Sequence, residues 1–115
     1  ILLALMASGF SGQRFTFHGY IPAKPDERRR AIHELERRSR TNDETQIFIE
    51  TPYRNDQLIE DLITTCSAQT RICVAVDISS GDERVISGTV SEWKQISYRP
   101  GKRPAIFLVT HRTHR

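Results

Sequence analysis

The sequence predicts a single α/β domain whose mixed, mostly parallel sheet of about five strands is flanked by helices. The chain has 115 residues, which fits one compact domain and is too short for two. Short segments that are apolar, or that alternate apolar and polar residues, are typical of strands, and along the chain they are separated by segments of helical periodicity. This alternation predicts strand–helix–strand connections, with the sheet buried between helices. The 37% of hydrophobic residues can fill a core, which excludes wholesale disorder.

The first third of the chain predicts a helix end, a strand and a long helix. Residues 1–8 have the composition of a helix terminus, which Gly9 ends. Residues 14–21 alternate as a strand does, with Phe15, Phe17 and Ile21 on one face and Thr16, His18 and Tyr20 on the other. Pro25, followed by two acids, then opens a helix that runs to about residue 40 on a seam of Ala31, Ile32 and Leu35.

The middle third predicts a strand, a helix and a second strand. Residues 45–50 and 72–78 are short apolar runs that fit strands covered on both faces. Between them, Thr51 and Pro52 cap and start a helix, because a threonine oxygen can accept from a free amide and proline fits the first helical position. The buried stripe of this helix consists of Leu58, Ile59, Leu62, Ile63 and Cys66.

The last third predicts two strands around a short helix. Residues 84–90 return as an extended segment in which Gly88 is a candidate bulge. Ser91 caps a short helix that carries Trp93 and Ile96. Residues 105–110 form a final apolar strand, and residues 111–115 are a basic tail.

The cysteines and histidines predict no metal site. Cys66 and Cys73 are seven positions apart, which fits no CxxC spacing, and two free thiols suit a reducing cytoplasm. No zinc-ligand spacing relates the four histidines, which are His18, His33, His111 and His114.

No apolar run approaches the roughly 20 residues of a membrane-spanning helix. Residues 1–8 lack the features of a signal peptide, and we expect them to continue from a longer protein.

The net charge of +3 comes from one segment. Residues 24–40 hold seven of the 17 basic and four of the 14 acidic residues, so the rest of the chain has ten of each. This segment is suited to RNA phosphates. Three acid–base pairs four residues apart fit a solvated helix face equally well: Asp26 with Arg30, Glu34 with Arg38, and Glu36 with Arg40. Both interpretations stay open.

Polar residues at two strand ends predict a ligand edge. In open α/β sheets, ligands bind beyond the carboxyl ends of the strands. The 49–54 loop brings Glu50 to a strand end beside Arg54, and a carboxylate there needs a partner or a ligand hydroxyl. The 75–79 loop adds the small side chain of Ala75 and the carboxylate of Asp77. The sequence contains no GxSxG, P-loop or GxGxxG motif and no Cys–His pair, so the catalytic residues are unknown.

Four ordered motifs resemble those of one family. They are residues 7–10 (ASGF), 14–24 (RFTFHGYIPAK) with Glu27 and Arg28 after it, 47–54 (IFIETPYR) and 83–93 (ERVISGTVSEW). Together they are similar to the C-terminal domain of the tetrapyrrole (corrin/porphyrin) methylase superfamily, in the branch of the 16S ribosomal RNA cytidine 2'-O-methyltransferases. The chain departs from the family pattern at Ile49, Thr51 and Tyr53, where tyrosine, serine and histidine are usual, and at Val76 and Asp77, where arginine and glutamate are usual.

The resemblance implies a two-domain methyltransferase that binds S-adenosylmethionine in the cleft between its domains and pairs as a homodimer. Residues 1–115 would form its C-terminal half, and the missing N-terminal domain would be their partner. By the same resemblance, the cofactor side of the cleft would be lined by Ile49, Glu50, Thr51, Ala75 and Asp77. The side toward ribosomal RNA would carry Lys24, Arg28 and Arg54. The isolated domain would be inactive, since the cofactor-binding glycine-rich loops of the family lie in the other domain.

Three functions remain open at this point. The first is methyl transfer to a ribose 2'-hydroxyl of ribosomal RNA, in which the protein aligns the cofactor and a base accepts the hydroxyl proton. The second is methylation of a tetrapyrrole by the same fold. The third is a non-catalytic RNA-binding module that uses residues 24–40. The basic segment favours RNA over a tetrapyrrole.

Overall fold

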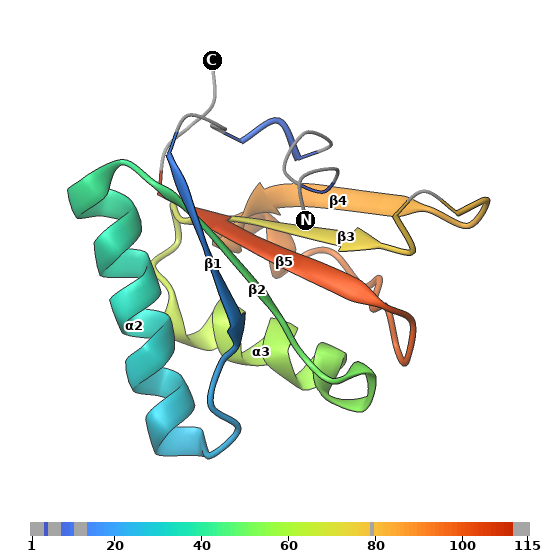
Figure 1. Ribbon diagram of the computed structural model, residues 1–115, viewed down its shortest axis with the longest axis horizontal. Helices are drawn as coiled ribbons and strands as arrows, with labels where there is room; N and C mark the ends of the chain where they lie inside the picture. Colours follow the sequence, from blue (N-terminus) through green and yellow to red (C-terminus); the bar gives the residue numbers. More distant parts are fainter. Residues whose placement is uncertain (1–3, 5–7, 11–13, 79, 112–115) are drawn as a thin grey trace.

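The computed structural model describes residue 4, residues 8–10, residues 14–78 and residues 80–111. In this part of the chain, five strands form one sheet with helices packed against it (Figure 1). In chain order the elements are β1 (Phe15–Tyr20), α2 (Pro25–Asn42), β2 (Thr45–Ile49), the 3-10 helix η1 (Pro52–Arg54), α3 (Asn55–Thr65), β3 (Arg71–Val76), β4 (Arg84–Thr89), α4 (Val90–Trp93) and β5 (Ala105–Thr110). The predicted order of strands and helices is confirmed. The predicted helix end and basic tail lie largely outside the described residues.

The sheet is mixed, but the prediction that it is mostly parallel is wrong. Its strand order is β1-β2-β5-β3-β4, and of the pairs in this sheet only β1 with β2 is parallel. The helical crossovers do carry β1, β2 and β3 in one direction, as the alternation predicted. β5 then enters between β2 and β3 in the opposite direction. The connection 77–83 is too short for a crossover, so β4 returns antiparallel to β3.

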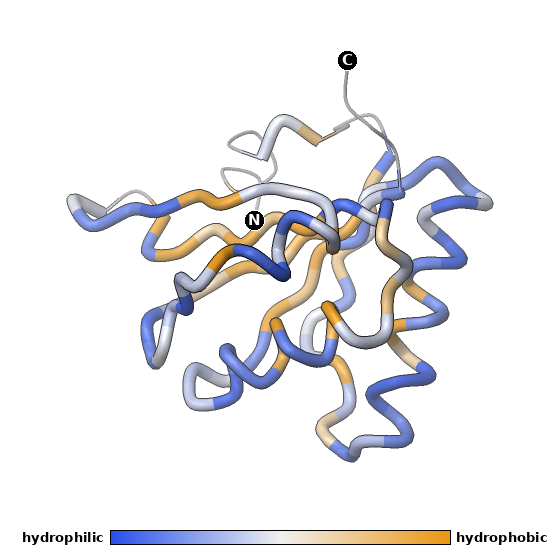
Figure 2. The backbone as a smooth tube through the Cα atoms, turned by 180° about the vertical axis from the view of Figure 1, so that it is seen from behind, coloured by the Kyte–Doolittle hydropathy of each residue, from blue (hydrophilic) through white to orange (hydrophobic). Residues whose placement is uncertain are grey.

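The larger core lies on the face that α2, α3 and α4 cover. Phe48 and Phe107 stack there on neighbouring strands, with ring centroids 5.9 Å apart. Trp93 is fully buried, and its indole Nε1 donates a hydrogen bond of 2.9 Å to the carbonyl oxygen of Ile72. The predicted stripe of α3 is buried in this core, including Cys66. Figure 2 shows the same layering, with apolar strands at the centre and polar helix turns outside.

A smaller cluster lies on the opposite face of the sheet. It consists of Ile47, Cys73, Ala75 and Leu108, with Ala4 and Phe10 from the N-terminal segment. Figure 1 places residues 8–10 across the sheet from α2 and α3. Helices α2, α3 and α4 thus cover one face, and the N-terminal segment, whose described residues 4 and 8 are helical, packs on the other, in agreement with the predicted sheet flanked by helices.

Strand β1 does not keep the alternation that the sequence predicted. Gly19 has a φ of +71°, and the register against β2 shifts between Phe17 and Tyr20. This irregularity turns Ile21 into the helix-side core, while Tyr20 opposes Ile49 and so points to the other face with Phe17. Phe15 and Phe17 are 41% and 43% exposed in the chain.

Two predicted helix caps and one bulge are wrong. Thr51 makes no cap hydrogen bond from its side chain, although Pro52 starts η1 as predicted. α4 is capped by Thr89 instead of Ser91: Thr89 Oγ1 accepts from the Glu92 amide at 3.1 Å, and Glu92 Oε1 accepts from the Thr89 amide at 2.7 Å. Gly88 lies in a regular ladder opposite Ile72. A Cβ at this position would lie 3.0 Å from Glu92 Oε1, so a larger residue here would require the side chain of Glu92 to shift by a few tenths of an ångström.

Candidate functional site

The predicted site residues gather along one edge of the sheet. Strands β1, β2 and β3 run in one direction, so their carboxyl ends meet at this edge. The loops that leave it are residues 21–24, 50–51 and 77–83, and the N-termini of α2 and η1 lie beside them. The structure therefore brings together the segments that hold all eight predicted site residues, but it separates their side chains onto two faces.

Glu50 points to the helix side, where the protein itself occupies both of its oxygens. The side chain is 3% exposed, and Oε2 forms an ion pair with Arg28, whose side chain is 4% exposed. Oε1 accepts the Thr51 amide at 2.7 Å and lies 4.0 Å from Nη1 of Arg54. A buried carboxylate is costly unless it is paired and hydrogen-bonded, and both conditions are met here.

Arg28 joins two loops of the edge. Its Nε donates to the carbonyl oxygen of Pro22 at 3.0 Å, in the loop after β1, while its guanidinium pairs with Glu50 at the end of β2. Because the side chain is buried in these contacts, Arg28 is not placed to reach a substrate at the surface of this domain. Its position instead holds the loop of Lys24 against the loop of Thr51.

The opposite face carries a continuous apolar row at the same edge. Directly paired positions on the five strands give the series Tyr20, Ile49, Ile106, Ala75 and Val85. Residues directly opposite in a sheet point to the same face, so the side chains of this row form one surface. Ala75 is 1% exposed, whereas Ile49 and Ile106 are half-buried. Of the predicted cofactor residues, Ile49 and Ala75 thus share a face, and Glu50 lies on the other.

Sequence reasoning missed Ile106, which lies between Ile49 and Ala75. The register pairs Ile106 with both of them. No local signal could have found it, because its place depends on the insertion of β5 between β2 and β3.

Asp77 is held by a second residue that sequence reasoning missed. Its Oδ2 lies 2.6 Å from Nε of Arg103, which also donates from Nη2 to the carbonyl oxygen of Asp82 at 2.6 Å. The hydrogen bond that Arg103 donates to Asp77 raises the pKa of Arg103. Asp77 itself has a φ of +50°, which turns the chain sharply out of β3. The carboxylate is thereby fixed at the edge, with Arg103 as its partner.

The remaining cations of the edge are Lys24 and Arg54. Lys24 is exposed at the start of α2. The Arg54 side chain is 42% exposed, and its guanidinium lies 4.9 Å from the centroid of the Tyr53 ring. Nη1 of Arg54 also donates to Thr51 Oγ1 at 3.2 Å. Both cations can reach a ligand at the surface.

Most of the basic segment is paired within the domain. Five of its seven cations form ion pairs: Arg28 with Glu50, Arg29 with Asp26, Arg37 with Glu34, Arg38 with Glu44 and Arg40 with Glu36. The Arg37 hydrogen bond lowers the pKa of Glu34, as expected for such a pair. The pairing favours the solvated-face interpretation for most of α2 and leaves the RNA interpretation to Lys24 and Arg30, the two cations of the segment outside these pairs.

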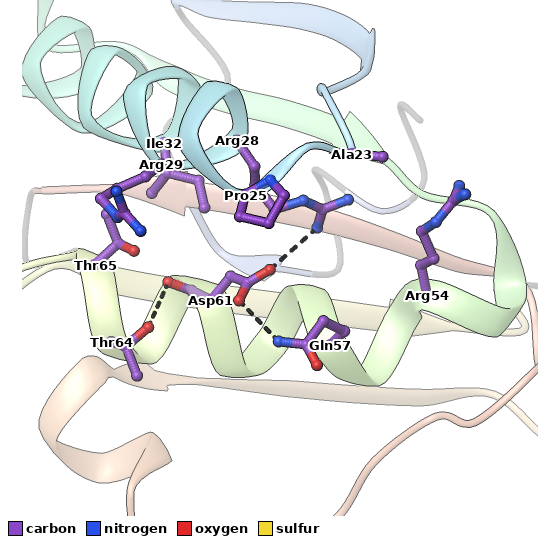
Figure 3. Close-up of a pocket in the computed structure, with 10 residues that line it drawn as sticks. All are labelled: Ala23, Pro25, Arg28, Arg29, Ile32, Arg54, Gln57, Asp61, Thr64 and Thr65. Carbon is purple, nitrogen blue, oxygen red and sulfur yellow. Dashed lines mark hydrogen bonds and ion pairs between the residues drawn. The ribbon is translucent and has the colours of Figure 1, made fainter.

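A hollow of about 390 Å³ lies between α2 and α3 on the helix side (Figure 3). Figure 3 shows the Arg28 guanidinium facing Asp61, and the shortest distance between them is 3.6 Å, from Nη1 to Oδ2. Gln57 Nε2 donates to the other oxygen of Asp61 at 2.9 Å. Three arginines line this hollow, Arg28, Arg29 and Arg54, against the one carboxylate of Asp61, and the buried Nη1 of Arg28 makes no hydrogen bond. The hollow is therefore net positive, and it lies on the helix side of the sheet, away from the apolar row.

The described residues include no helix that is long and apolar enough to span a membrane. They also include no cluster of three or more histidine, cysteine or carboxylate side chains arranged to hold a metal ion.

The fold of this chain is similar to that of solved methyltransferase and synthase structures. Its fold resembles diphthine synthase (TM-score 0.67, 15% identity, 98% of this chain and 45% of that one). It also resembles the methyltransferase CobJ (TM-score 0.59, 19% identity, 95% and 46%). A third similar structure is the uroporphyrin-III C-methyl transferase from Thermus thermophilus, complexed with S-adenosyl homocysteine (TM-score 0.52, 17% identity, 93% and 48%). At these identities the likeness concerns the fold alone.

Sequence comparison identifies the branch. No protein-family model matches the chain. The chain is 31% identical over 110 residues to the ribosomal RNA small subunit methyltransferase I of Xylella fastidiosa, covering 95% of this chain and 39% of that protein. It is 28% identical over 85 residues to the protein of the same name in Vibrio cholerae, covering 74% and 28%. The expected resemblance to the ribosomal RNA methyltransferase branch is confirmed. The chain spans less than two-fifths of the length of these relatives.

Proposed function

We propose that this chain is the C-terminal domain of an S-adenosylmethionine-dependent methyltransferase that modifies a ribose 2'-hydroxyl of ribosomal RNA. The observation that carries the proposal is the sequence relationship, over 95% of the chain, to a ribosomal RNA small subunit methyltransferase I. Because the chain spans 39% of that relative, the second domain and the catalytic base belong to the rest of the protein. The same proposal places the protein in the cytoplasm as a homodimer.

The apolar row suits one wall of the cofactor site. An adenine base has two flat apolar faces, and the half-buried side chains of Ile49 and Ile106 are chemically suited to pack against one of them. Asp77 stands at the same edge as a fixed acceptor. When bound, S-adenosylmethionine supplies the methyl group as an electrophilic carbon. Glu50 does not fit the role of a ligand contact, because its oxygens are already used inside the domain.

The role of this domain toward RNA is to position the backbone. Lys24 and Arg54 are the exposed cations of the predicted substrate set, and cations of this kind bind phosphates without reading sequence. Arg28 holds the loops of Lys24 and Thr51 together through its contacts with Pro22 and Glu50. The non-catalytic RNA-binding alternative loses its main support, because five of the seven cations of the basic segment are paired within the domain.

The proposal is tested by offering the full-length protein radiolabelled S-adenosylmethionine with three acceptors. These are small ribosomal subunits, free 16S ribosomal RNA and a porphyrinogen. We expect label in RNA, at a nucleotide whose 3' linkage becomes resistant to alkaline hydrolysis, as a 2'-O-methyl group requires. Label in the porphyrinogen alone would support the tetrapyrrole alternative. Salt-sensitive RNA binding without any methyl transfer would support the RNA-binding module.

A further inference from the structure

Strand β1 is an edge strand that leaves aromatic side chains open. It pairs with β2 on one side and has no strand on the other in the described sheet. Phe15, Phe17 and Tyr20 are 41%, 43% and 63% exposed. Their pairing partners in β2 place Phe17 and Tyr20 on the face opposite the helices. An uncovered strand edge with exposed apolar side chains can template pairing with another strand.

The backbone of β1 is also open along this edge. The carbonyl oxygen of Arg14 accepts the Thr45 amide of β2 at 2.9 Å. Because the backbone groups of successive residues in a strand point to alternate sides, those of Phe15 and Phe17 point away from β2. Phe15 and Phe17, whose side chains are exposed, therefore also direct their backbone N–H and C=O groups toward the open edge.

The helix side of β1 is open as well. α2 packs over β2 and β5, and a hollow of about 290 Å³ remains between it and β1. Ile21, Ala31 and Leu35 contribute apolar surface to this hollow, and His18, Glu34 and Arg38 contribute polar groups. A strand added beside β1 would therefore meet space on both faces of the sheet.

The exposed side of α2 next to this hollow is complementary in charge to an antiparallel copy of itself. Its exposed charges alternate along the helix as Glu27, Arg30, Glu34 and Arg37. When the helix is reversed, Glu27 lies opposite arginine 37 of the copy, and Arg30 lies opposite glutamate 34. A twofold axis produces this reversal, and it would place the Glu34–Arg37 ion pair of each copy beside the Arg30 and Glu27 positions of the other, in one network of alternating charges.

We infer that β1 pairs antiparallel with β1 of a second copy of this chain, so that the two sheets become one. Phe15 would lie opposite Phe17 of the partner subunit, with Thr16 at the twofold axis. This pairing satisfies the outward backbone groups and buries four phenylalanines in one cluster. The inference deepens the proposed homodimer by naming its interface, and it does not depend on methyl transfer.

RNA is the other class of partner that exposed aromatic side chains attract. Bases can stack on Phe15 and Phe17, but such stacking leaves the outward N–H and C=O groups of β1 without partners. A second copy satisfies both the side chains and the backbone. The structure therefore favours the dimer, and RNA becomes an outcome of the test.

Cross-linking tests the register in the full-length protein. Both cysteines of the chain are buried, and burial raises the pKa of each to about 12, so they are poor competitors for oxidation. Thr16→Cys should form a disulfide-linked dimer under mild oxidation, since a non-hydrogen-bonded antiparallel pair brings Cα atoms within disulfide range. Ser87→Cys, at an exposed position on the other edge strand, β4, is the control, and it lies in the row of Phe17. Equal cross-linking of both variants, or none at Thr16, overturns the pairing.

Sedimentation measures the interface without a cross-link. Phe17→Lys should raise the dissociation constant of the full-length dimer about 100-fold, because a charge would be buried in the aromatic cluster. Ser87→Lys should leave it unchanged, and circular dichroism checks that both variants fold. A wild type that is monomeric at tens of micromolar, or an unchanged constant in Phe17→Lys with weakened RNA binding, overturns the inference in favour of RNA. Loss of dimers with retained methylation separates this result from a failure of the proposed activity.

Discussion

At the scale of single residues, Glu36 shows how a buried carboxylate ties a helix to a connecting segment. Its Oε2 accepts hydrogen bonds from the Ser67 amide at 2.7 Å, Ser67 Oγ at 2.9 Å and Thr70 Oγ1 at 2.5 Å. Burial raises the pKa of Glu36, but the hydrogen bonds from Thr70 and Ser67 outweigh it, and the pKa lies below the ordinary 4.5. The charged form therefore ties α2 to the segment before β3.

This lowered pKa predicts an acid-sensitive contribution to stability. A carboxyl group whose pKa is lower in the folded chain stabilises the fold fully above its unfolded pKa and loses this effect as pH falls through the folded pKa. Glu36→Gln should lower the free energy of unfolding by about 1–3 kcal/mol at pH 7. The difference from wild type should shrink below the ordinary pKa of 4.5. Urea unfolding at pH 7 and pH 3, followed by Trp93 fluorescence, measures both values.

Exposed Glu34 is the control for this experiment. Glu34→Gln removes a carboxylate from the same helix, yet its partner Arg37 is exposed too, so stability should hardly change. A pH-independent loss in Glu36→Gln would show that packing, and not ionisation, is what Glu36 contributes.

The ion pair of Arg28 and Glu50 predicts a larger loss. Arg28→Gln leaves the carboxylate of Glu50 buried without its counter-charge and should cost about 3–5 kcal/mol. The exposed neighbour Arg29 offers a matched control, and Arg29→Gln should cost little. Chemical unfolding compares the two variants. If they lose equal stability, the pair does not hold the edge loops as described.

At the scale of elements, the short helix α4 allows a direct comparison of the predicted N-cap, Ser91, with the observed N-cap, Thr89. Thr89→Ala removes the hydroxyl that accepts the Glu92 amide and should cost about 1 kcal/mol. Ser91→Ala should be nearly neutral, because Thr89 is the N-cap residue. Thermal unfolding of the two variants decides between them, and the reverse order of stability would restore Ser91 as the cap.

The elements themselves were predictable because each depends on local periodicity. The α3 stripe of Leu58, Ile59, Leu62 and Ile63 repeats at helical spacing and is buried as expected. Strand β1 shows where this reasoning ends. Its two-residue alternation predicted one face for Phe17 and Ile21, but the left-handed backbone at Gly19 places them on opposite faces. The positive φ of Gly19 thus places the residues after it on the opposite face from the one that the alternation predicted.

At the scale of the whole molecule, the proposed site has one wall in this chain. The apolar row offers a surface, while the two hollows described here lie on the helix side and do not include Ile49 or Ala75. We therefore expect S-adenosylhomocysteine to bind tightly to the full-length protein and weakly or not at all to residues 1–115. Calorimetric titration of both measures this difference. Equal affinities would place the whole cofactor site within this chain.

A substitution in the apolar row tests whether its side chains contribute to cofactor binding. Ile106→Asp in the full-length protein should weaken S-adenosylhomocysteine at least tenfold, because it places a charge between Ile49 and Ala75. Gln95→Asp, which introduces the same charge at an exposed position after α4, is the control. Unchanged affinity in a folded Ile106→Asp protein would remove the row from the cofactor site.

By itself, the sequence determined the succession of strands and helices, the common direction of β1, β2 and β3, and the loops that form the ligand edge. These follow from side-chain periodicity and from the geometry of strand–helix–strand connections, which are local. Only the tertiary structure decided that β5 runs between β2 and β3, that Arg28 is buried against Glu50 and that Arg103 holds Asp77. Each of these depends on contacts between residues at least 22 positions apart, whose free energy is gained only after the chain has folded.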